Sequence, residues 1–188
     1  WMTLGEWATA EELLQGVVAR FGEEQAEEIA KLVLPKLGEA LLMLDRPQEA
    51  AAVLQPLVDS KKATRRTAQT YGRALAGWAE YVPSTDDRPG QGQVHPGMGD
   101  EESLTAAVEV LRQLDGVAEK WTTDWFDFKF DMLYAFFVWS QLDSKNLEPV
   151  KSQLDFLSSP VNIGSTFEHE LMPENLRQKY LWLRAQAR

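Results

Sequence analysis

The sequence predicts an all-α protein built from stacked helix-turn-helix units. A short motif, LGEAL at 37–41, recurs as YGRAL at 71–75, so that Gly38 and Gly72 are 34 residues apart. This period is typical of helical solenoid repeats. Apolar residues also recur at helical spacing along most of the chain. In each motif the small glycine is expected to face a bulky side chain, which lets two helices pack closely.

Length and composition fit one domain spanning residues 1–188. Of the 188 residues, 44% are hydrophobic and 26% are charged, which is ordinary for a soluble globular protein with a sizeable core. No apolar run approaches about 18 residues, the length of a membrane-spanning helix, so we expect no membrane insertion. The visible start shows no signal-peptide pattern, although a mature or excised fragment would look the same.

Charge and cysteine usage exclude several classes of partner and chemistry. The net charge of −10 argues against nucleic acid or an anionic membrane as the main partner. The segment 61–80 is nevertheless basic, with 5 bases and 1 acid. Without cysteine there is no disulfide framework, thiolate metal site or cysteine nucleophile. The cytoplasm is the default location, but the composition fits any compartment.

Two helices are expected at the N-terminal end. Thr9 and Glu12 fit a capping box at the start of the first helix, and Gly22 is a natural stop. Between them runs an apolar stripe at helical spacing: Leu13, Leu14, Val17, Val18 and Phe21. The second helix opens with glutamates and extends to Leu44. It contains Pro35, where we expect a kink or break because proline lacks the backbone N–H.

The repeated units carry a recognisable pattern of residues. Copies of the first-helix pattern begin at Leu34, Ala68 and Tyr134, and the following helices carry A-x3-L or V-x3-L at 50–54, 107–111 and 150–154. This pattern resembles the tetratricopeptide repeat family over about residues 9–160. The chain lacks the first consensus tryptophan, and Val138 replaces the third glycine. The resemblance implies a right-handed αα-superhelix in which the first helix of each repeat lines a concave groove.

An insertion separates the two helices of the second unit. It adds about 23 residues to the 34-residue frame, and its segment 83–100 is rich in glycine, proline and polar residues. Such a composition buries too little apolar surface to order itself, so we expect a solvent-exposed loop. An alternative is a flap over the groove or a docking segment.

The helix expected at 121–142 is the richest in aromatic residues, and most of these are expected in the core. The alternative for one or two aromatic residues at an edge of the helix is that they line a ligand groove. Asp124, Asp127 and Asp131 share one helix face, which we interpret as solvated. Proline and glycine break up 158–173. A final helix starting at Pro173 fits a terminal cap, or the first half of a further repeat in a longer solenoid.

Catalytic and metal-binding constellations are scarce. The two histidines are His95, in the insertion, and His169, between Glu168 and Glu170. Adjacent residues do not present the i, i+4 face that a helical metal site uses. The sequence also lacks a phosphate-binding glycine loop, a dinucleotide fingerprint and a nucleophile elbow. We therefore expect neither an enzyme nor a bound metal or cofactor.

A peptide-binding groove has better support. By the frame of the resemblance, the residues that line it are Lys36, Glu39, Arg66, Gln69, Arg73, Met132 and Trp139. Arg66 and Arg73 lie seven apart on one helix face, and arginine binds carboxylates bidentately. An acidic segment of another protein with an apolar anchor is therefore the expected ligand, although plain solvated charges would look alike. The Lys–Asn clamp that this family uses for C-terminal carboxylates is absent.

Two further interpretations remain. The chain begins and ends in half-repeats with tryptophans nearby, which fits a structural module that self-associates or stacks on a neighbouring domain. The tryptophan-rich helix also suggests a small-molecule or sugar site, but such sites need convergent polar groups.

Overall fold

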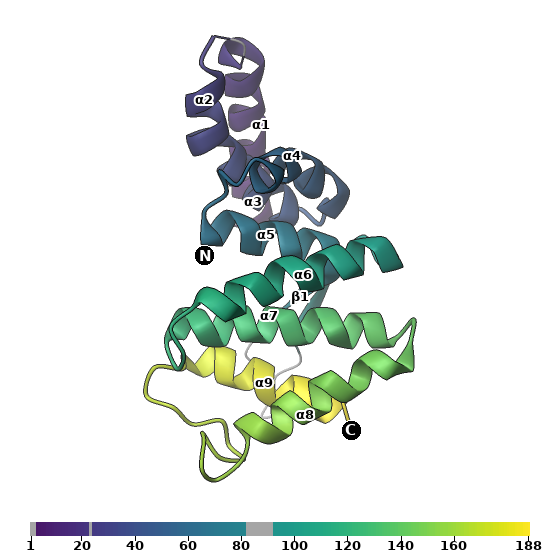
Figure 1. Cartoon of the computed structure of the whole chain (residues 1–188). Coiled ribbons are helices and arrows are strands. Elements are labelled where there is room, and N and C mark those ends of the chain that lie inside the picture. The colour runs from purple at the N-terminus through teal and green to yellow at the C-terminus, as the bar shows by residue number, and fades with distance from the viewer. Residues whose placement is uncertain (1–2, 23, 82–91) are drawn as a thin grey trace.

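The computed structural model describes residues 3–22, 24–81 and 92–188, and it is mostly helical (Figure 1). The first half contains α1 (Leu4–Phe21), α2 (Ala26–Glu28), the π-helical turn η1 (Ile29–Val33), α3 (Leu34–Met43), α4 (Pro47–Asp59) and α5 (Arg65–Ala76). A hairpin of β1 (Gly77–Tyr81) and β2 (Gly92–Pro96) follows. The second half contains α6 (Glu101–Val117), α7 (Thr123–Ser140), the 3-10 turn η2 (Ser144–Asn146), α8 (Leu147–Leu157) and α9 (Glu174–Gln186).

From α3 to α8, each long helix packs against the next one along the chain. The helices α3, α5 and α7 also contact one another in that order, and α9 packs on α7, α8 and β1 (Figure 1). The prediction of an all-α fold is therefore confirmed at the level of helix content. Among the described residues, no helix is both long and apolar enough to cross a membrane.

The repeated glycines make the close helix contacts that the motif predicts. A Cβ atom on Gly38 of α3 would lie 2.5 Å from Cγ of Leu54 in α4. A Cβ atom on Gly72 of α5 would lie 2.8 Å from Cγ of Leu111 in α6. Both leucines are almost completely buried. Only a residue without a side chain allows this approach, so the same glycine–leucine contact joins the two helices of both units.

The first helix starts earlier than its sequence suggests. The capping box is formed by Thr3 and Glu6, and the prediction of Thr9 and Glu12 is wrong because Thr9 lies inside α1 and donates to the carbonyl of Gly5. Gly22 ends the helix as expected. Of the described side chains of α1, only a few apolar ones pack against the core. Of the predicted stripe, the partly buried members Leu14 and Val18 pack on the core, whereas Leu13 is 67% exposed.

Pro35 disturbs its helix as predicted. The chain enters this helix as the short α2, passes through the π-helical turn η1, and regains α-helical geometry in α3, where Pro35 lies in the first turn. A proline is tolerated in the first turn of a helix because a backbone N–H at that position has no acceptor within the helix, so its loss costs little. The π-turn widens the backbone immediately before the proline.

Part of the insertion is an ordered β-hairpin, so the expectation of a structureless loop over 83–100 is wrong for 92–96. β1 and β2 pair antiparallel with Trp78 opposite His95, while 83–91 lies outside the described residues. The base of the hairpin is tight: a Cβ on Gly97 would lie 2.2 Å from the Gly77 nitrogen, and Gly77 has φ of 84°. The chain thus returns to the end of α5, and α6 can pack directly on α5.

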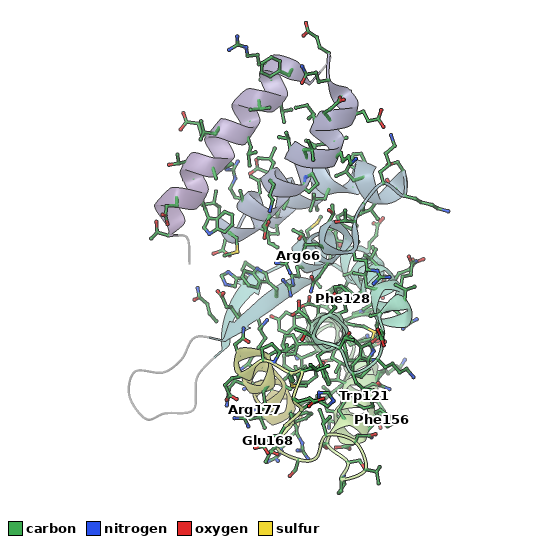
Figure 2. The ribbon with its side chains drawn as sticks, turned by 90° about the vertical axis from the view of Figure 1, so that its left-hand side faces the viewer. Arg66, Trp121, Phe128, Phe156, Glu168 and Arg177 are labelled. Atoms are coloured by element: carbon green, nitrogen blue, oxygen red, sulfur yellow. The ribbon has the colours of Figure 1, made fainter. Side chains whose placement is uncertain are left out.

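The aromatic residues of α7 form the centre of the core, as predicted. Phe126 and Phe130 are fully buried, and the hydroxyl of the buried Tyr180 in α9 donates to the Phe126 carbonyl at 2.7 Å. Figure 2 shows α7 surrounded by side chains from the neighbouring helices. The final helix starts directly after Pro173, as expected, and closes this end of the core.

Candidate functional site

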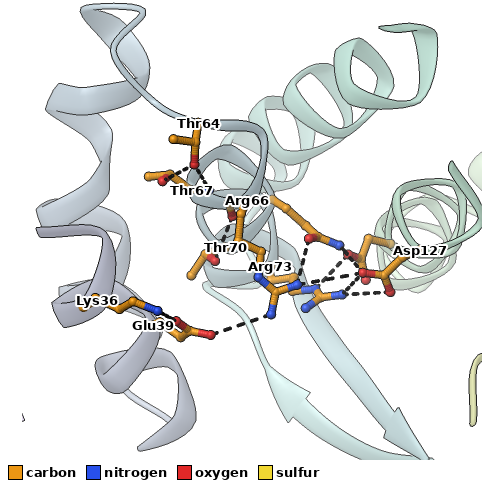
Figure 3. Close-up of polar contacts among 10 residues, drawn as sticks. Lys36, Glu39, Thr64, Arg66, Thr67, Thr70, Arg73 and Asp127 are labelled. Atoms are coloured by element: carbon orange, nitrogen blue, oxygen red, sulfur yellow. Dashed lines mark hydrogen bonds and ion pairs between the residues drawn. The ribbon is translucent and has the colours of Figure 1, made fainter. Parts of the chain in front are cut away.

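One face of α5 organises the polar centre of the molecule. The hydroxyl of Thr64 caps α5 by accepting the Thr67 N–H at 3.1 Å, which fixes where the helix begins. Arg66, Gln69 and Arg73 then follow at i, i+3 and i+7, so they share the face that looks toward α3 and α7. The sequence predicted this shared face, and the structure brings all three side chains together (Figure 3).

Behind this face lies a buried network of charges and amides. Arg73 donates through Nε to Asp131 at 2.7 Å and through Nη2 to Asp127 at 3.2 Å. The amide of Gln69 donates to both carboxylates, at 2.7 and 2.6 Å. Asp131 is only 3% exposed. The prediction of a solvated aspartate face on α7 is therefore wrong for Asp127 and Asp131, and it holds for the exposed Asp124.

Burial and neighbouring cations push the two aspartates in opposite directions. Burial raises the pKa of Asp131, and the nearby Arg73 only partly opposes this. Burial by itself would also raise the pKa of Asp127, but the positive charges of Arg73, Lys179 and Arg66 outweigh it and lower this pKa. Asp127 is thus the carboxylate that holds its negative charge most firmly beside Arg73.

Arg66 lies at the exposed edge of this network. Its side chain is 61% exposed, with Nη2 3.6 Å from the Glu39 carboxylate and Nη1 4.0 Å from that of Asp127. Its firmest contact is a hydrogen bond of 3.1 Å to the Gln69 side chain. Lys36 pairs with the other side of Glu39 at 3.4 Å and is 69% exposed. Figure 3 shows Arg66 between Glu39 of α3 and Asp127 of α7.

A cavity of about 320 Å³ opens beside these residues. Its apolar part is lined by Trp7, Leu42, Met43 and Trp78. Its polar part is lined by Glu39, Arg66, Thr70, Arg73, Glu80, Asp127, Asn175 and Lys179. The lining comes from α1, α3, α5, α7, β1 and α9, so tertiary packing alone creates this space. Within the described chain, the indole N–H groups of Trp7 and Trp78 have no hydrogen-bond partner.

Lys179 of α9 is the least satisfied cation in this cavity. Its ammonium lies 5.1 Å from the centre of the Phe130 ring, and the described residues give it no hydrogen bond. Burial and the neighbouring Arg73 lower its pKa, against the attraction of Asp131, Asp127 and Glu80. In the sequence, Lys179 is one of several cations in the helix that follows Pro173. Its place in the cavity could not be read from local spacing.

The remaining groove candidates lie elsewhere. Met132 is 6% exposed and belongs to the core. Trp139 is half-buried and stacks on Phe136 with ring centres 6.3 Å apart. Neither lines the cavity, and Lys36 lies outside it. Of the predicted residues, the structure therefore gathers Glu39, Arg66, Gln69 and Arg73. The helical period places Met132 and Trp139 seven apart on one face of α7, and that face packs inward.

His95 is a structural residue of the hairpin. It is 7% exposed, stacks on Trp78 at 4.1 Å and holds Nδ1 2.7 Å from the Asp45 carboxylate. Its Nε2 lies 3.9 Å from Glu80. His169 stacks on Trp121 at a ring distance of 6.1 Å. Throughout the part of the chain that the structure describes, no three acidic or histidine side chains gather in a way that could hold a metal.

Comparison with known proteins gives no family assignment. The chain matches no protein-family model, no curated protein and no solved structure.

Proposed function

We propose that the protein is a non-enzymatic interaction module with a tetratricopeptide-like, right-handed αα-superhelix. In this proposal, a peptide segment of another protein binds along the concave face formed by α3, α5 and α7. The observation that carries the proposal is the cavity of about 320 Å³ at that face, which is lined by both apolar and charged side chains. Pockets of this size that combine apolar walls with a few polar groups are typical binding sites.

The lining favours binding over catalysis. The hydroxyl of Thr70 donates to the Arg66 carbonyl at 3.0 Å, so it is not activated by a base. Asp127 is held by Arg73 and by the Gln69 amide. Groups that are already paired serve to fix the shape and charge of a surface, whereas a general base needs a free lone pair at the reacting proton.

An acidic peptide with an apolar anchor fits the available groups. Trp7, Leu42 and Met43 offer an apolar wall for the anchor. Arg73 already uses Nε and Nη2 on the buried aspartates, so the exposed Arg66 is the arginine that can meet an acidic residue. Arginine at a rim adds specificity and association rate, while the apolar anchor supplies most of the affinity.

Selection from a random-peptide display library tests this proposal. We expect the wild-type protein to enrich peptides that pair an acidic residue with a large apolar one, and Arg66→Glu to enrich them at least about tenfold less. Arg65→Glu is the matched control, because Arg65 is the adjacent arginine of α5 and does not line the cavity. Equal enrichment by the wild type and Arg66→Glu, or no enrichment at all, would contradict the proposal.

Self-association is a second candidate function. Leu13 of α1 is 67% exposed, Phe156 of α8 is 52% exposed and Val161 is 88% exposed. Figure 2 places Phe156 far from α1, so these apolar residues lie toward opposite ends of the molecule. Head-to-tail stacking of copies would cover both. Light scattering over a wide concentration range decides this candidate, since a constant monomeric mass would exclude it.

A further inference from the structure

Lys179 lines the cavity and combines partial burial, a positive charge and donor groups that no described residue accepts. Its ammonium has three N–H donors, and the described residues accept none of them. It packs over Phe130 at 5.1 Å, close enough to the aspartates of α7 to feel their charge. A cation that is partly withdrawn from water without a hydrogen-bond acceptor is unfavourable, and a bound anion would relieve this.

We propose that Lys179 and Arg66 together bind the side-chain carboxylate of a glutamate in the bound peptide. The apolar residue next to that glutamate packs against Trp7, Leu42 and Met43. This inference rests on the proposed function, and it names the chemical class of ligand for that same cavity and the residue that recognises it. One of the two cations that bind the acid, Lys179, thus comes from α9, outside the repeated units.

Among the described residues, the lining carries the cations Arg66, Arg73 and Lys179 and the acids Glu39, Glu80 and Asp127, so the pairing of these groups decides what remains open to a ligand. Asp127 and Asp131 are engaged by Arg73 and Gln69. Glu39 accepts a hydrogen bond from Lys36 and also faces Arg66.

Among the described residues, Lys179 is therefore the cation of the lining with no hydrogen-bond acceptor. Arg66 is the more exposed of the two lining arginines. A basic ligand side chain would instead have to approach Lys179, Arg66 and Arg73.

Nuclear magnetic resonance with short blocked peptides tests the inference. The indole N–H signals of Trp7 and Trp78 report on the cavity, and Trp→Phe variants at the two positions assign them. The probe is acetyl-Leu-Glu-amide, and the comparison probes are acetyl-Leu-Gln-amide and acetyl-Leu-Lys-amide. We expect saturable shifts with the glutamate probe and at least about tenfold weaker binding of the glutamine probe, since a charge-assisted contact is lost.

Variants at Lys179 test whether this residue recognises the glutamate side chain. Lys179→Met is expected to abolish the preference for glutamate over glutamine, and Lys179→Arg to retain it. Arg188→Met is the matched control, because Arg188 follows α9 but does not line the cavity. Thermal unfolding of each variant verifies that the fold is kept.

Several outcomes would overturn the inference. They are equal binding of the glutamate and glutamine probes by the wild type, tighter binding of the lysine probe, a full preference in Lys179→Met, or no shift with any probe. Equal binding of the neutral and acidic probes would leave the peptide-binding proposal standing, because the cavity would still take a peptide. The display selection tests that broader proposal separately.

Discussion

Arg73 is the residue on which the polar centre depends. It neutralises two carboxylates of α7, one of them almost completely buried. A buried ion pair adds little stability compared with an apolar replacement of the whole pair, but removal of one partner leaves an uncompensated charge. Arg73 therefore joins α5 to α7 through a contact that tolerates no single neutral substitution.

We expect Arg73→Met to lower the free energy of unfolding by about 3–5 kcal/mol, because Asp131 would lose its cation in a site that excludes water. Urea unfolding followed by circular dichroism measures the change. The double variant Arg73→Met with Asp131→Leu should be considerably more stable than Arg73→Met alone. A loss below about 1 kcal/mol in the single variant would mean that Asp131 does not depend on this arginine.

At the scale of elements, two close helix contacts are made by glycine. Gly38 lets α3 approach α4, and Gly72 lets α5 approach α6, in each case against a buried leucine. The hairpin inserted between α5 and α6 does not disturb this contact, because its two strands return to the same point. An insertion closed at its base can therefore lengthen a helix unit while its packing is kept.

A pair of alanine substitutions separates packing from helix propensity. Gly38→Ala should destabilise the protein by about 1–3 kcal/mol, since the new methyl group would overlap Leu54 and force α3 and α4 apart. Gly16→Ala, in α1 with no atom within 4 Å of the added Cβ, should stabilise by about 0.5–1 kcal/mol. Thermal and urea unfolding measure both. A neutral Gly38→Ala would contradict the close helix contact.

At the scale of the whole molecule, one core connects α3 with α9, and the last helix completes it. Tyr180 is fully buried, and its hydroxyl is bonded to the α7 backbone. Burial raises the pKa of Tyr134 to about 12 and that of Tyr180 well above its ordinary value. These phenols can ionise at their ordinary pKa only when the core opens.

Stability should therefore fall at alkaline pH. The folded protein holds these phenolic protons more tightly than the unfolded chain, whose tyrosines have a pKa of about 10. The contribution is fully present below that pH and is lost as the pH rises through the raised pKa of Tyr134, about 12.

Urea unfolding at increasing pH, with the tyrosinate absorbance as a second signal, measures the loss. Tyr180→Phe should reduce this pH dependence. A tyrosinate titration that is the same for the folded and the unfolded protein would contradict it.

The sequence alone determined the helical units and their contacts. The spacing of apolar residues, the stop at Gly22 and the disturbance at Pro35 depend on residues within a few turns of one another. The role of Gly38 and Gly72 was predictable because the motif that contains them is repeated 34 residues later. The shared face of Arg66, Gln69 and Arg73 was predictable for the same reason, since helix geometry fixes which side chains lie on one side.

Only the tertiary structure decided what that face meets. It pairs Asp127 and the buried Asp131 with Arg73, pairs β1 with β2, and places Lys179 of α9 and Trp7 of α1 in the lining of one cavity. Burial and charge pairing depend on residues far apart in the chain. Local spacing specifies a helix face, but the distance between faces is set by the packing of the whole core.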